Sequence, residues 1–365
     1  MPQLFKHYIN GRWETGVTLG VSENPSDLDD VVGEFARADA SQTEEAVRAA
    51  ADARSAWADS TPQRRFEVLD AIGNELIARK DELGRLLARE EGKTLPEATA
   101  EAMRAGMIFK FFAGEALRLR GDRLPSVRPG VDVEITREPV GVVALITPWN
   151  FPLAIPAWKI APALAWGNTV VFKPAELVPA CACALAEIIA RSGLPAGVFN
   201  LVMGSGRMVG QTMVDSPLVD AISFTGSVPV GEGILAAAGA RRVKVQLEMG
   251  GKNPLVVLAD ADLQQAVECA VQGAYFSTGQ RCTASSRLIV EAPVYAAFVE
   301  RLRERVRQLK VGHALKRGTE IGPVVDARQL ESVRNYIEIG RAEGAELLVV
   351  GDRGRGRSRR HRGQR

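Results

Sequence analysis

Repeated alternation of apolar runs and helical stretches constrains the fold of this 365-residue chain more than any other feature. Apolar runs begin near Val142, Thr169, Val198, Ala221 and Val243, at spacings of 22 to 29 residues, and a helical pattern follows each of the first four. This spacing suits βαβ units, in which crossover helices join parallel strands. The sequence therefore predicts an α/β fold with a doubly wound, mostly parallel sheet, whose ligands bind at the carboxyl ends of the strands.

The sequence on either side of this region predicts further helices and strands. An Asn-Gly pair within residues 8–13 predicts a hairpin, Ser41 and Glu44 form a capping box for a helix to about Ala58, and Pro62 opens another helix. Helical periodicity also covers residues 80–91, 96–119 and 293–310. Strands are expected at 131–136 (half exposed), 253–259 (buried) and 284–290. Residues 260–263 are expected to cap a helix at its N-terminus.

Composition indicates an ordinary soluble globular protein, with 46% hydrophobic and 25% charged residues and length enough for two domains. Four cysteines without an apparent secretory signal favour a reducing cytoplasm over a disulfide framework. Cys181 and Cys183 lie two apart in a helical pattern and point in different directions, so no metal site is expected. Residues 141–158 carry no charge, but three prolines would break a spanning helix, so no membrane partner is expected either.

The formal net charge of +2 hides an asymmetry between the body and the C-terminal residues 351–365. That tail holds seven arginines and one aspartate, and the rest of the chain carries 39 basic against 43 acidic residues, a net charge of −4. Such Arg/Gly repeats are typical of disorder. One interpretation is a nucleic-acid-binding arm. We favour the other, an accident such as a changed reading frame, because composition switches abruptly inside an apparent strand at residues 347–350.

Candidate chemistry centres on Cys282, which small and polar residues surround. The three histidines, His7, His313 and His361, are distant in sequence, so a carboxylate is the expected base for a cysteine nucleophile. Glu248 ends an alternating run and precedes two glycines, where backbone can approach a ligand. From the residues alone, inert packing of Cys282 and a surface position for Glu248 stay open.

Two segments carry a resemblance that favours the catalytic interpretation. Residues 279–282 (Gly-Gln-Arg-Cys) and 247–254 (Leu-Glu-Met-Gly-Gly-Lys-Asn-Pro) resemble the signatures of the NAD(P)-dependent aldehyde dehydrogenase superfamily. The resemblance extends from about Tyr8 to about Val349, and residues 280–287 are particularly similar to the ketoglutarate and succinate semialdehyde branches. It implies oxidation of an aldehyde to the acid with NAD(P)+ through a cysteine thiohemiacetal and a thioester.

The resemblance implies four catalytic residues. Cys282 would be the nucleophile, Glu248 the general base, Asn150 the oxyanion donor and Lys159 a relay for protons from the base. Asn150 lies in a Thr-Pro-Trp-Asn-Phe-Pro segment that also matches the family, although a turn-forming amide is the alternative. For Lys159, on an otherwise apolar helix, the alternative is a lysine that snorkels to solvent.

Cofactor contacts are likewise implied by the resemblance. Lys173 and Glu176 would bind the adenosine ribose, where a carboxylate repels a 2′-phosphate and favours NAD, with NADP possible; an exposed ion pair is the alternative. Ser227 and the start of the helix after it would face the pyrophosphate. The glycine turns at residues 204–210 and 224–231 do not match the GxGxxG pattern. The residues assigned to the cofactor are Thr147, Pro148, Trp149, Lys173, Glu176, Gly206, Phe224, Thr225, Gly226, Ser227, Leu247 and Gly250.

The resemblance also predicts the domain organisation. Residues 1–124 and 145–249 would form a Rossmann-like NAD-binding domain, 125–144 an oligomerisation ribbon, and 250–350 an incomplete second α/β catalytic domain before the atypical tail of 351–365. Family members continue further, so an inactive fragment that retains the NAD-binding fold is the competing hypothesis. The family forms homo-oligomers, and the missing strands argue against assembly here. Arg281 suggests a substrate with a second carboxylate, unless it points away to a structural acid.

Overall fold

The computed structural model describes residues 2–349, which divide into two compact units. Within the described residues, the first unit comprises residues 2–22, Gly33–Leu86 and Thr99–Met249, and the second comprises Glu23–Val32, Leu87–Ala98 and residues 250–349. The Arg/Gly-rich tail, residues 351–365, lies outside the described residues. None of the described helices combines the length and apolar character that crossing a membrane requires.

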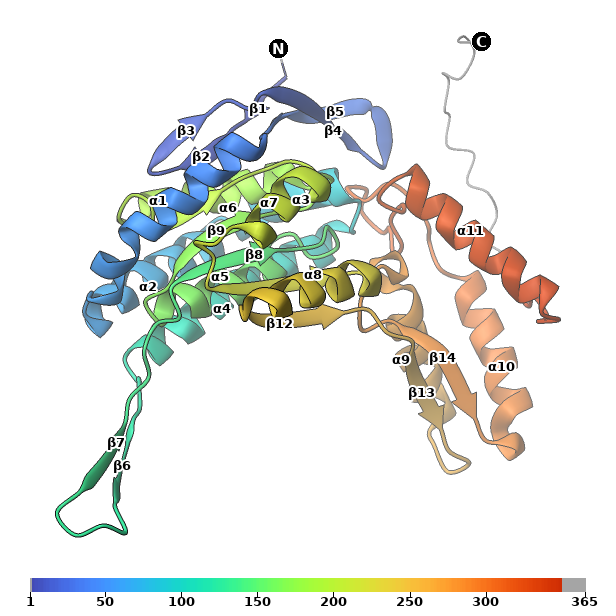
Figure 1. Cartoon of the computed structure of the whole chain (residues 1–365). Helices are drawn as coiled ribbons and strands as arrows, with labels where there is room; N and C mark the ends of the chain where they lie inside the picture. Colours follow the sequence, from blue (N-terminus) through green and yellow to red (C-terminus); the bar gives the residue numbers. More distant parts are fainter. Residues whose placement is uncertain (1, 350–365) are drawn as a thin grey trace. The chain divides into compact units, whose positions relative to one another are not determined.

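A seven-stranded sheet forms the centre of the first unit (Figure 1). Its strands follow the order β12-β11-β8-β9-β10-β2-β3, and the first five are parallel to one another, whereas β2 and β3 are antiparallel. The predicted doubly wound, mostly parallel α/β sheet is therefore confirmed. The bounds are β8 Val142–Ile146, β9 Thr169–Lys173, β10 Phe199–Leu201, β11 Ala221–Gly226, β12 Lys244–Met249, β2 His7–Ile9 and β3 Arg12–Glu14.

Helices cover both faces of this sheet. One face packs against α1, α7 and α8 in a cluster that includes Val47, Met213, Ile222 and Ile234. The other face carries α5 and α6, which α2 backs. The helices are α1 Ala40–Ala58, α2 Pro62–Ala78, α3 Lys80–Glu91, α4 Leu95–Ala116, α5 Ala154–Ala165, α6 Pro179–Arg191, α7 Gln211–Asp215 and α8 Val228–Arg241.

Local capping chemistry explains where the N-terminal helices begin. α2 begins as predicted, with Pro62 at its first position and the Thr61 side chain accepting from the Arg64 backbone N–H. The predicted cap of α1 was wrong: Asp39 caps this helix by accepting from Gln42 N–H, so Ser41 lies within the first turn. The predicted hairpin is confirmed, and both of its turn residues, Asn10 and Gly11, are left-handed with φ of 49° and 79°.

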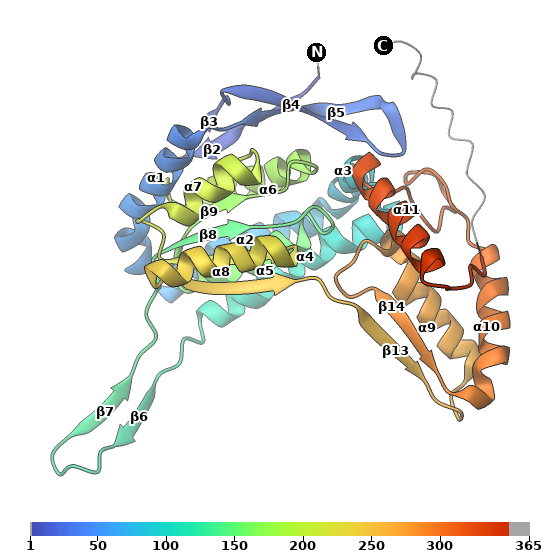
Figure 2. The ribbon, with the colours of Figure 1, turned by 45° about the vertical axis from the view of Figure 1, so that its right-hand side comes forward.

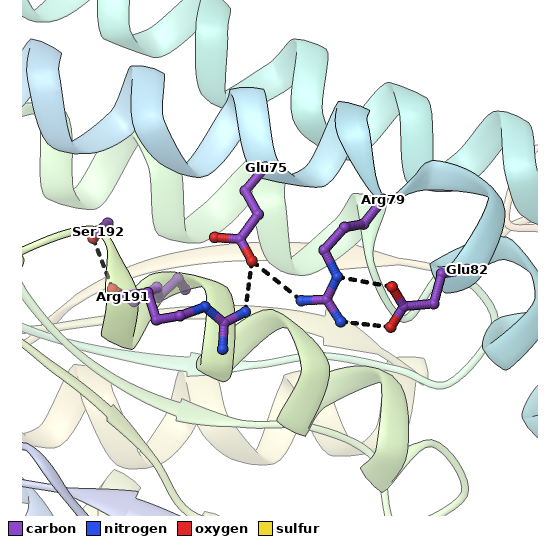
Figure 3. A network of polar contacts seen from close by, with 6 residues as sticks. Glu75, Arg79, Glu82, Arg191 and Ser192 are labelled. Atoms are coloured by element: carbon purple, nitrogen blue, oxygen red, sulfur yellow. Dashed lines mark hydrogen bonds and ion pairs between the residues drawn. The ribbon is translucent and has the colours of Figure 1, made fainter.

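An ion-pair network joins the helices on one side of the first unit (Figure 3). Glu75 at the end of α2 accepts from Arg191 of α6 at 2.5 Å and from Arg79 at 3.2 Å. Arg79 also makes a two-pronged contact with Glu82 of α3, at 3.0 and 2.6 Å. These side chains are partly exposed, so each pair adds little stability, but together they fix α6 against α2.

A two-stranded antiparallel ribbon extends away from the rest of the first unit (Figures 1 and 2). It consists of β6 Asp122–Pro125 and β7 Asp132–Ile135. A strand was predicted here as half exposed, but every residue of β7 is exposed. The small sheet β1-β5-β4 comprises Leu4–Phe5, Asp27–Arg37 and Thr18–Asn24.

The second unit contains a parallel pair, β13 Asn253–Val257 and β14 Ser285–Val290, which packs against α9 Leu263–Tyr275 and α10 Ala292–Arg307. Asp262 caps α9 as predicted, accepting from two backbone N–H groups. Only the helix-facing side of β13 is buried, so the prediction of a buried strand was wrong for Val256, whose side chain is 58% exposed. Helix α11 Ala327–Ala342 was not predicted, and residues 347–349 form no strand.

Candidate active site

The parallel sheet brings the sequence motifs of the first unit to one edge. Ile146 at the end of β8 pairs in register with Lys173 of β9 on one side and with Phe224 of β11 on the other. Residues 147–150, 174–176 and 227 follow the carboxyl ends of these strands. Loops that are far apart in sequence therefore lie at the same end of the sheet.

The strand order reverses direction between β8 and β11. From β8 the chain adds β9 and β10 on one side, and β11 and β12 on the other. In open α/β sheets such a switch point is where nucleotide ligands bind, outside the carboxyl ends of the strands. The segments that flank it are Thr147–Asn150 after β8 and Thr225–Ser227 at the end of β11, which contain six of the predicted cofactor residues and the predicted oxyanion donor.

The turn after β11 has the features of a phosphate site. Ser227 is the N-cap of α8, and the first turn of that helix is exposed at Val228 and Val230. A Cβ built on Gly231 would lie 2.4 Å from the Met249 sulfur, so any larger residue there would require the Met249 side chain to move. Gly206 opens a π-helical turn, and nothing lies within 4 Å of a Cβ built there. The side chain of Ser227 accepts no capping hydrogen bond, and the backbone N–H groups at the start of a helix suit an anion.

Lys173 and Glu176 lie in different environments after β9. Lys173 is buried, and its ammonium donates to the Pro174 carbonyl at 2.9 Å. Burial lowers the pKa of Lys173 to about 8, against the smaller opposing effect of the Glu176 charge. Glu176 forms a partly exposed ion pair with Arg37, with 3.0 Å between Oε1 and Nε, a partner that the sequence did not indicate.

Lys159 is buried on the sheet-facing side of α5. Its ammonium donates to Ser223 Oγ of β11 at 2.7 Å and to Gln246 Oε1 of β12 at 3.0 Å, and Ser223 donates to the same Gln246 oxygen at 2.5 Å. The side chain is 8% exposed, so it does not extend to solvent as a snorkelling lysine would. Burial lowers the pKa of Lys159 to about 8, and the Glu248 charge partly opposes this shift.

Glu248 shares a face of β12 with Gln246, because residues two apart in a strand point the same way. Its register partner on β11 is Thr225, one residue before the end of that strand. Glu248 is exposed, which leaves its carboxylate accessible to water. Leu247, on the opposite face, packs against the core beneath α8.

The Asn150 loop is fixed by a carboxylate from a neighbouring helix. Glu101 of α4 accepts from the backbone N–H groups of Leu153 and Ala154, at 3.0 and 3.1 Å, directly before α5 begins. At the other end of the loop, Thr147 N–H donates to the Lys173 carbonyl at 3.2 Å. Asn150 itself is half-buried.

In the second unit, Cys282 is half-buried between α9 and β14. Its carbonyl accepts from the Asn253 side-chain amide at 2.7 Å, and the same amide donates to the Ala284 carbonyl at 3.2 Å. Among the other thiols, Cys181 and Cys183 are buried and Cys269 is exposed on α9. Asn150, Lys159 and Glu248 belong to the first unit, and Gly250 and Cys282 belong to the second.

Arg281 points to the backbone at the end of α9. Its guanidinium donates to the carbonyls of Gln272 and Gly273, where a cation favourably meets the helix C-terminus. Arg281 therefore pairs with carbonyl groups and not with a structural acid. These contacts use Nη2 of the side chain that was expected to bind a substrate carboxylate. Within residues 2–349, no group of three His, Cys, Asp or Glu side chains is placed to hold a metal ion.

Four residues that form hydrogen bonds or ion pairs around the candidate site were not predicted from the sequence. Ser223 and Gln246 bond to Lys159, and nothing in the sequence pairs these positions before the β11–β12 register is known. Arg37 pairs with Glu176 from the end of β5. The sequence signal for Glu97 is a Thr-x-x-Glu capping box that begins at Thr94.

Comparisons with known proteins agree with these features. Residues 17–363 match the model of the aldehyde dehydrogenase family. The chain is 45% identical to alpha-ketoglutaric semialdehyde dehydrogenase of Bacillus subtilis over 352 residues, which is 96% of this chain and 72% of the relative. Two solved structures are similar: betaine aldehyde dehydrogenase from Staphylococcus aureus in complex with NAD+ (TM-score 0.92, 35% identity, 94% of this chain and 69% of that one) and an NADP dependent enzyme from E. coli (TM-score 0.92, 37% identity, 94% and 72%).

Proposed function

This chain belongs to the aldehyde dehydrogenase family, enzymes that oxidise aldehydes to acids with NAD(P)+, and from that premise we propose a small semialdehyde with a carboxylate at its far end as the substrate. The identity of 45% with alpha-ketoglutaric semialdehyde dehydrogenase, over nearly the whole chain, carries this proposal. Because Nη2 of Arg281 donates to carbonyl groups of α9, we assign the recognition of the substrate carboxylate to another cation.

The chemistry needs a tetrahedral adduct, since a planar carbonyl carbon cannot give up a hydride and leave an acyl group that water can attack. The Cys282 thiolate forms a carbon–sulfur bond to the aldehyde, and the carbonyl oxygen becomes an oxyanion. The Asn150 amide and the Cys282 backbone N–H stabilise that oxygen, each donor contributing about 3 kcal/mol. When bound, NAD(P)+ would supply the hydride acceptor, and loss of hydride from the adduct leaves a thioester on Cys282.

Glu248 then removes a proton from water, which attacks the thioester carbon; the carbon–sulfur bond breaks and the acid is released. Lys159 serves as a relay for protons from Glu248. A lysine whose pKa is lowered to about 8 is suited to this role, because it exchanges protons more readily near neutral pH than a lysine in water. With no histidine assigned to the site, these two groups carry the proton transfers.

For the cofactor, the edge of the sheet offers fitting groups. The backbone N–H groups at the start of α8, after Ser227, suit the pyrophosphate, while Lys173 and Glu176 offer a donor and an acceptor for ribose hydroxyls. Gly206 and Gly250 leave open space where a side chain would otherwise lie. The remaining assigned contacts are Thr147, Pro148, Trp149, Phe224, Thr225, Gly226 and Leu247.

Cofactor preference should depend on the Arg37–Glu176 ion pair. Changing Glu176→Gln should raise the ratio of kcat/KM for NADP over NAD by roughly tenfold, because the carboxylate no longer repels a 2′-phosphate and Arg37 is free to bind it. Initial rates with both cofactors measure this ratio. Adding Arg37→Ala to Glu176→Gln should remove most of the gain, and an unchanged ratio in the single variant would refute the assignment.

The aldehyde proposal is tested by NADH formation from a panel of substrates. Succinic, glutaric and ketoglutaric semialdehydes should exceed propanal in kcat/KM by at least about tenfold, since a chain 45% identical to alpha-ketoglutaric semialdehyde dehydrogenase should bind the second carboxylate. Equal values would contradict a dicarboxylic substrate. A folded chain that binds NAD and makes no NADH from any aldehyde would instead support the inactive-fragment hypothesis.

The same premise assigns roles to the remaining parts. We assign NAD binding to residues 1–124 and 145–249, the counterpart of the family's oligomerisation ribbon to residues 125–144, and catalysis to residues 250–350. The Val133 and Ile135 side chains of β7 in this ribbon are exposed. Four free cysteines agree with a cytoplasmic location, which is reducing.

A further inference from the structure

The turn that precedes Cys282 has an unusual backbone conformation. Ser277, Thr278 and Gly279 are consecutive residues in the left-handed region, with φ of 51°, 57° and 69°. Glycine adopts this region freely, whereas serine does so at a cost and a β-branched threonine is an outlier there. Such a conformation persists only where surrounding groups enforce it, and it tends to occur at functional sites.

A single carboxylate oxygen holds the first of these residues. Oε1 of Glu97 accepts from the Ser277 backbone N–H at 2.8 Å and from the Ser277 hydroxyl at 3.2 Å, across 180 positions of sequence. A carboxylate that receives two donors is a strong hydrogen-bond acceptor. Thr278 is held separately, because its hydroxyl lies 3.1 Å from the Gly322 carbonyl and 3.3 Å from the Pro323 carbonyl.

The other oxygen of Glu97 fixes the carboxylate itself. Oε2 accepts from the Thr94 hydroxyl at 2.7 Å and from the Thr94 backbone N–H at 3.3 Å, so Glu97 completes a capping box at the start of α4. One oxygen thus belongs to a helix cap and the other to the turn. Because the cap immobilises the side chain, Glu97 can impose a conformation on Ser277 rather than merely follow it.

Beyond the turn, the chain is held again at Cys282. The Asn253 amide binds the Cys282 carbonyl, and Arg281 is bonded to the end of α9. With both ends fixed, the conformation of residues 277–279 determines the direction in which the backbone arrives at Cys282. We propose that Glu97 is a positioning residue for Cys282, an inference that rests on the proposed role of Cys282 as nucleophile and oxyanion donor.

Thiol labelling tests this inference without requiring turnover. The alkylation rate of Cys282 by iodoacetamide is followed by peptide mass spectrometry, with exposed Cys269 on α9 as the internal reference. In Glu97→Ala, the turn should relax and release half-buried Cys282, so its rate should rise about fivefold while that of Cys269 stays within about twofold. Glu97→Gln retains an acceptor for the Ser277 N–H but loses the acceptor for the Thr94 N–H, so its Cys282 rate should lie between those of Glu97→Ala and the unaltered chain.

Adding Ser277→Gly and Thr278→Gly to Glu97→Ala provides the decisive control, because glycine adopts the left-handed turn without the carboxylate. This triple variant should return the Cys282 rate to within about twofold of the original. If Glu97→Ala unfolds the chain, buried Cys181 and Cys183 will also label, and the glycine variant should reverse this. An unchanged Cys282 rate in Glu97→Ala, or a failure of the glycines to rescue it, overturns the proposal. Normal labelling behaviour without NADH formation would leave the turn's role intact and refute the catalytic assignment instead.

Discussion

Changing Cys282→Ser should abolish NADH formation, lowering kcat/KM by roughly four orders of magnitude. A serine hydroxyl is almost entirely protonated near neutral pH, and in this sequence no histidine neighbours position 282 to activate it. No other thiol can substitute, because Cys181 and Cys183 are buried in α6 and Cys269 lies on the exposed side of α9. Steady-state NADH absorbance with a semialdehyde substrate measures the loss.

Cys269→Ser is the matched control for that experiment. It makes the same atom change at an exposed site, and it should keep kcat/KM within about twofold of the original chain. Retained activity in Cys282→Ser would show that the nucleophile lies elsewhere. A comparable loss in Cys269→Ser would show that the effect arises from folding.

Changing Glu248→Gln should separate the two halves of the reaction. Hydride transfer precedes the attack of water, so the variant should produce about one equivalent of NADH per site in a rapid phase and then turn over roughly a thousandfold more slowly. Glutamine keeps the size of the side chain and cannot accept the proton. The change also removes the charge that raises the pKa of Lys159 against the effect of burial, so that pKa should fall below about 8.

Stopped-flow absorbance resolves the rapid phase from the slow one. Glu331→Gln, an exposed change on α11, is the matched control and should show normal turnover. Steady-state turnover of Glu248→Gln at the original rate would exclude Glu248 as the base. Loss of the rapid phase together with the slow one would place its role before hydride transfer rather than after it.

The parallel sheet was predictable because its strands are buried on both faces. All of β9 and the first four residues of β8 are buried, so each strand appears in the sequence as an unbroken apolar run. The helical patterns between these runs indicated the crossover connections.

The burial of the strands in the second unit was harder to predict from the sequence. β13 alternates because helices cover one face alone, and an apolar sequence such as Leu-Val-Val does not show which side is covered.

Site residues that act through neighbours could not be read from local sequence. A single lysine on an apolar helix is equally compatible with a solvent-reaching and a buried ammonium. Only the pairing of Ser223 with Gln246 across β11 and β12 supplies the two oxygens that hold Lys159. Glu97 shows the same limit, because its capping box is local whereas its second partner is remote.

Local signals also compete where several side chains can serve the same purpose. Asp39 and Ser41 are both good helix caps. α1 begins two residues earlier than the capping-box pattern indicated, so Asp39 occupies the N-cap position. The direction of Arg281 was likewise open, since carbonyls at a helix end attract a guanidinium as a carboxylate does.

The covalent bond between Cys282 and the substrate is the most direct test of this account. The Glu248→Gln chain is mixed with NAD+ and ketoglutaric semialdehyde, quenched in acid after the rapid phase, digested and analysed by mass spectrometry. The account predicts the mass of one acyl group on the peptide that contains Cys282, in proportion to the NADH formed. NADH formation with no acyl group on that peptide, or with the group on another cysteine, would contradict it.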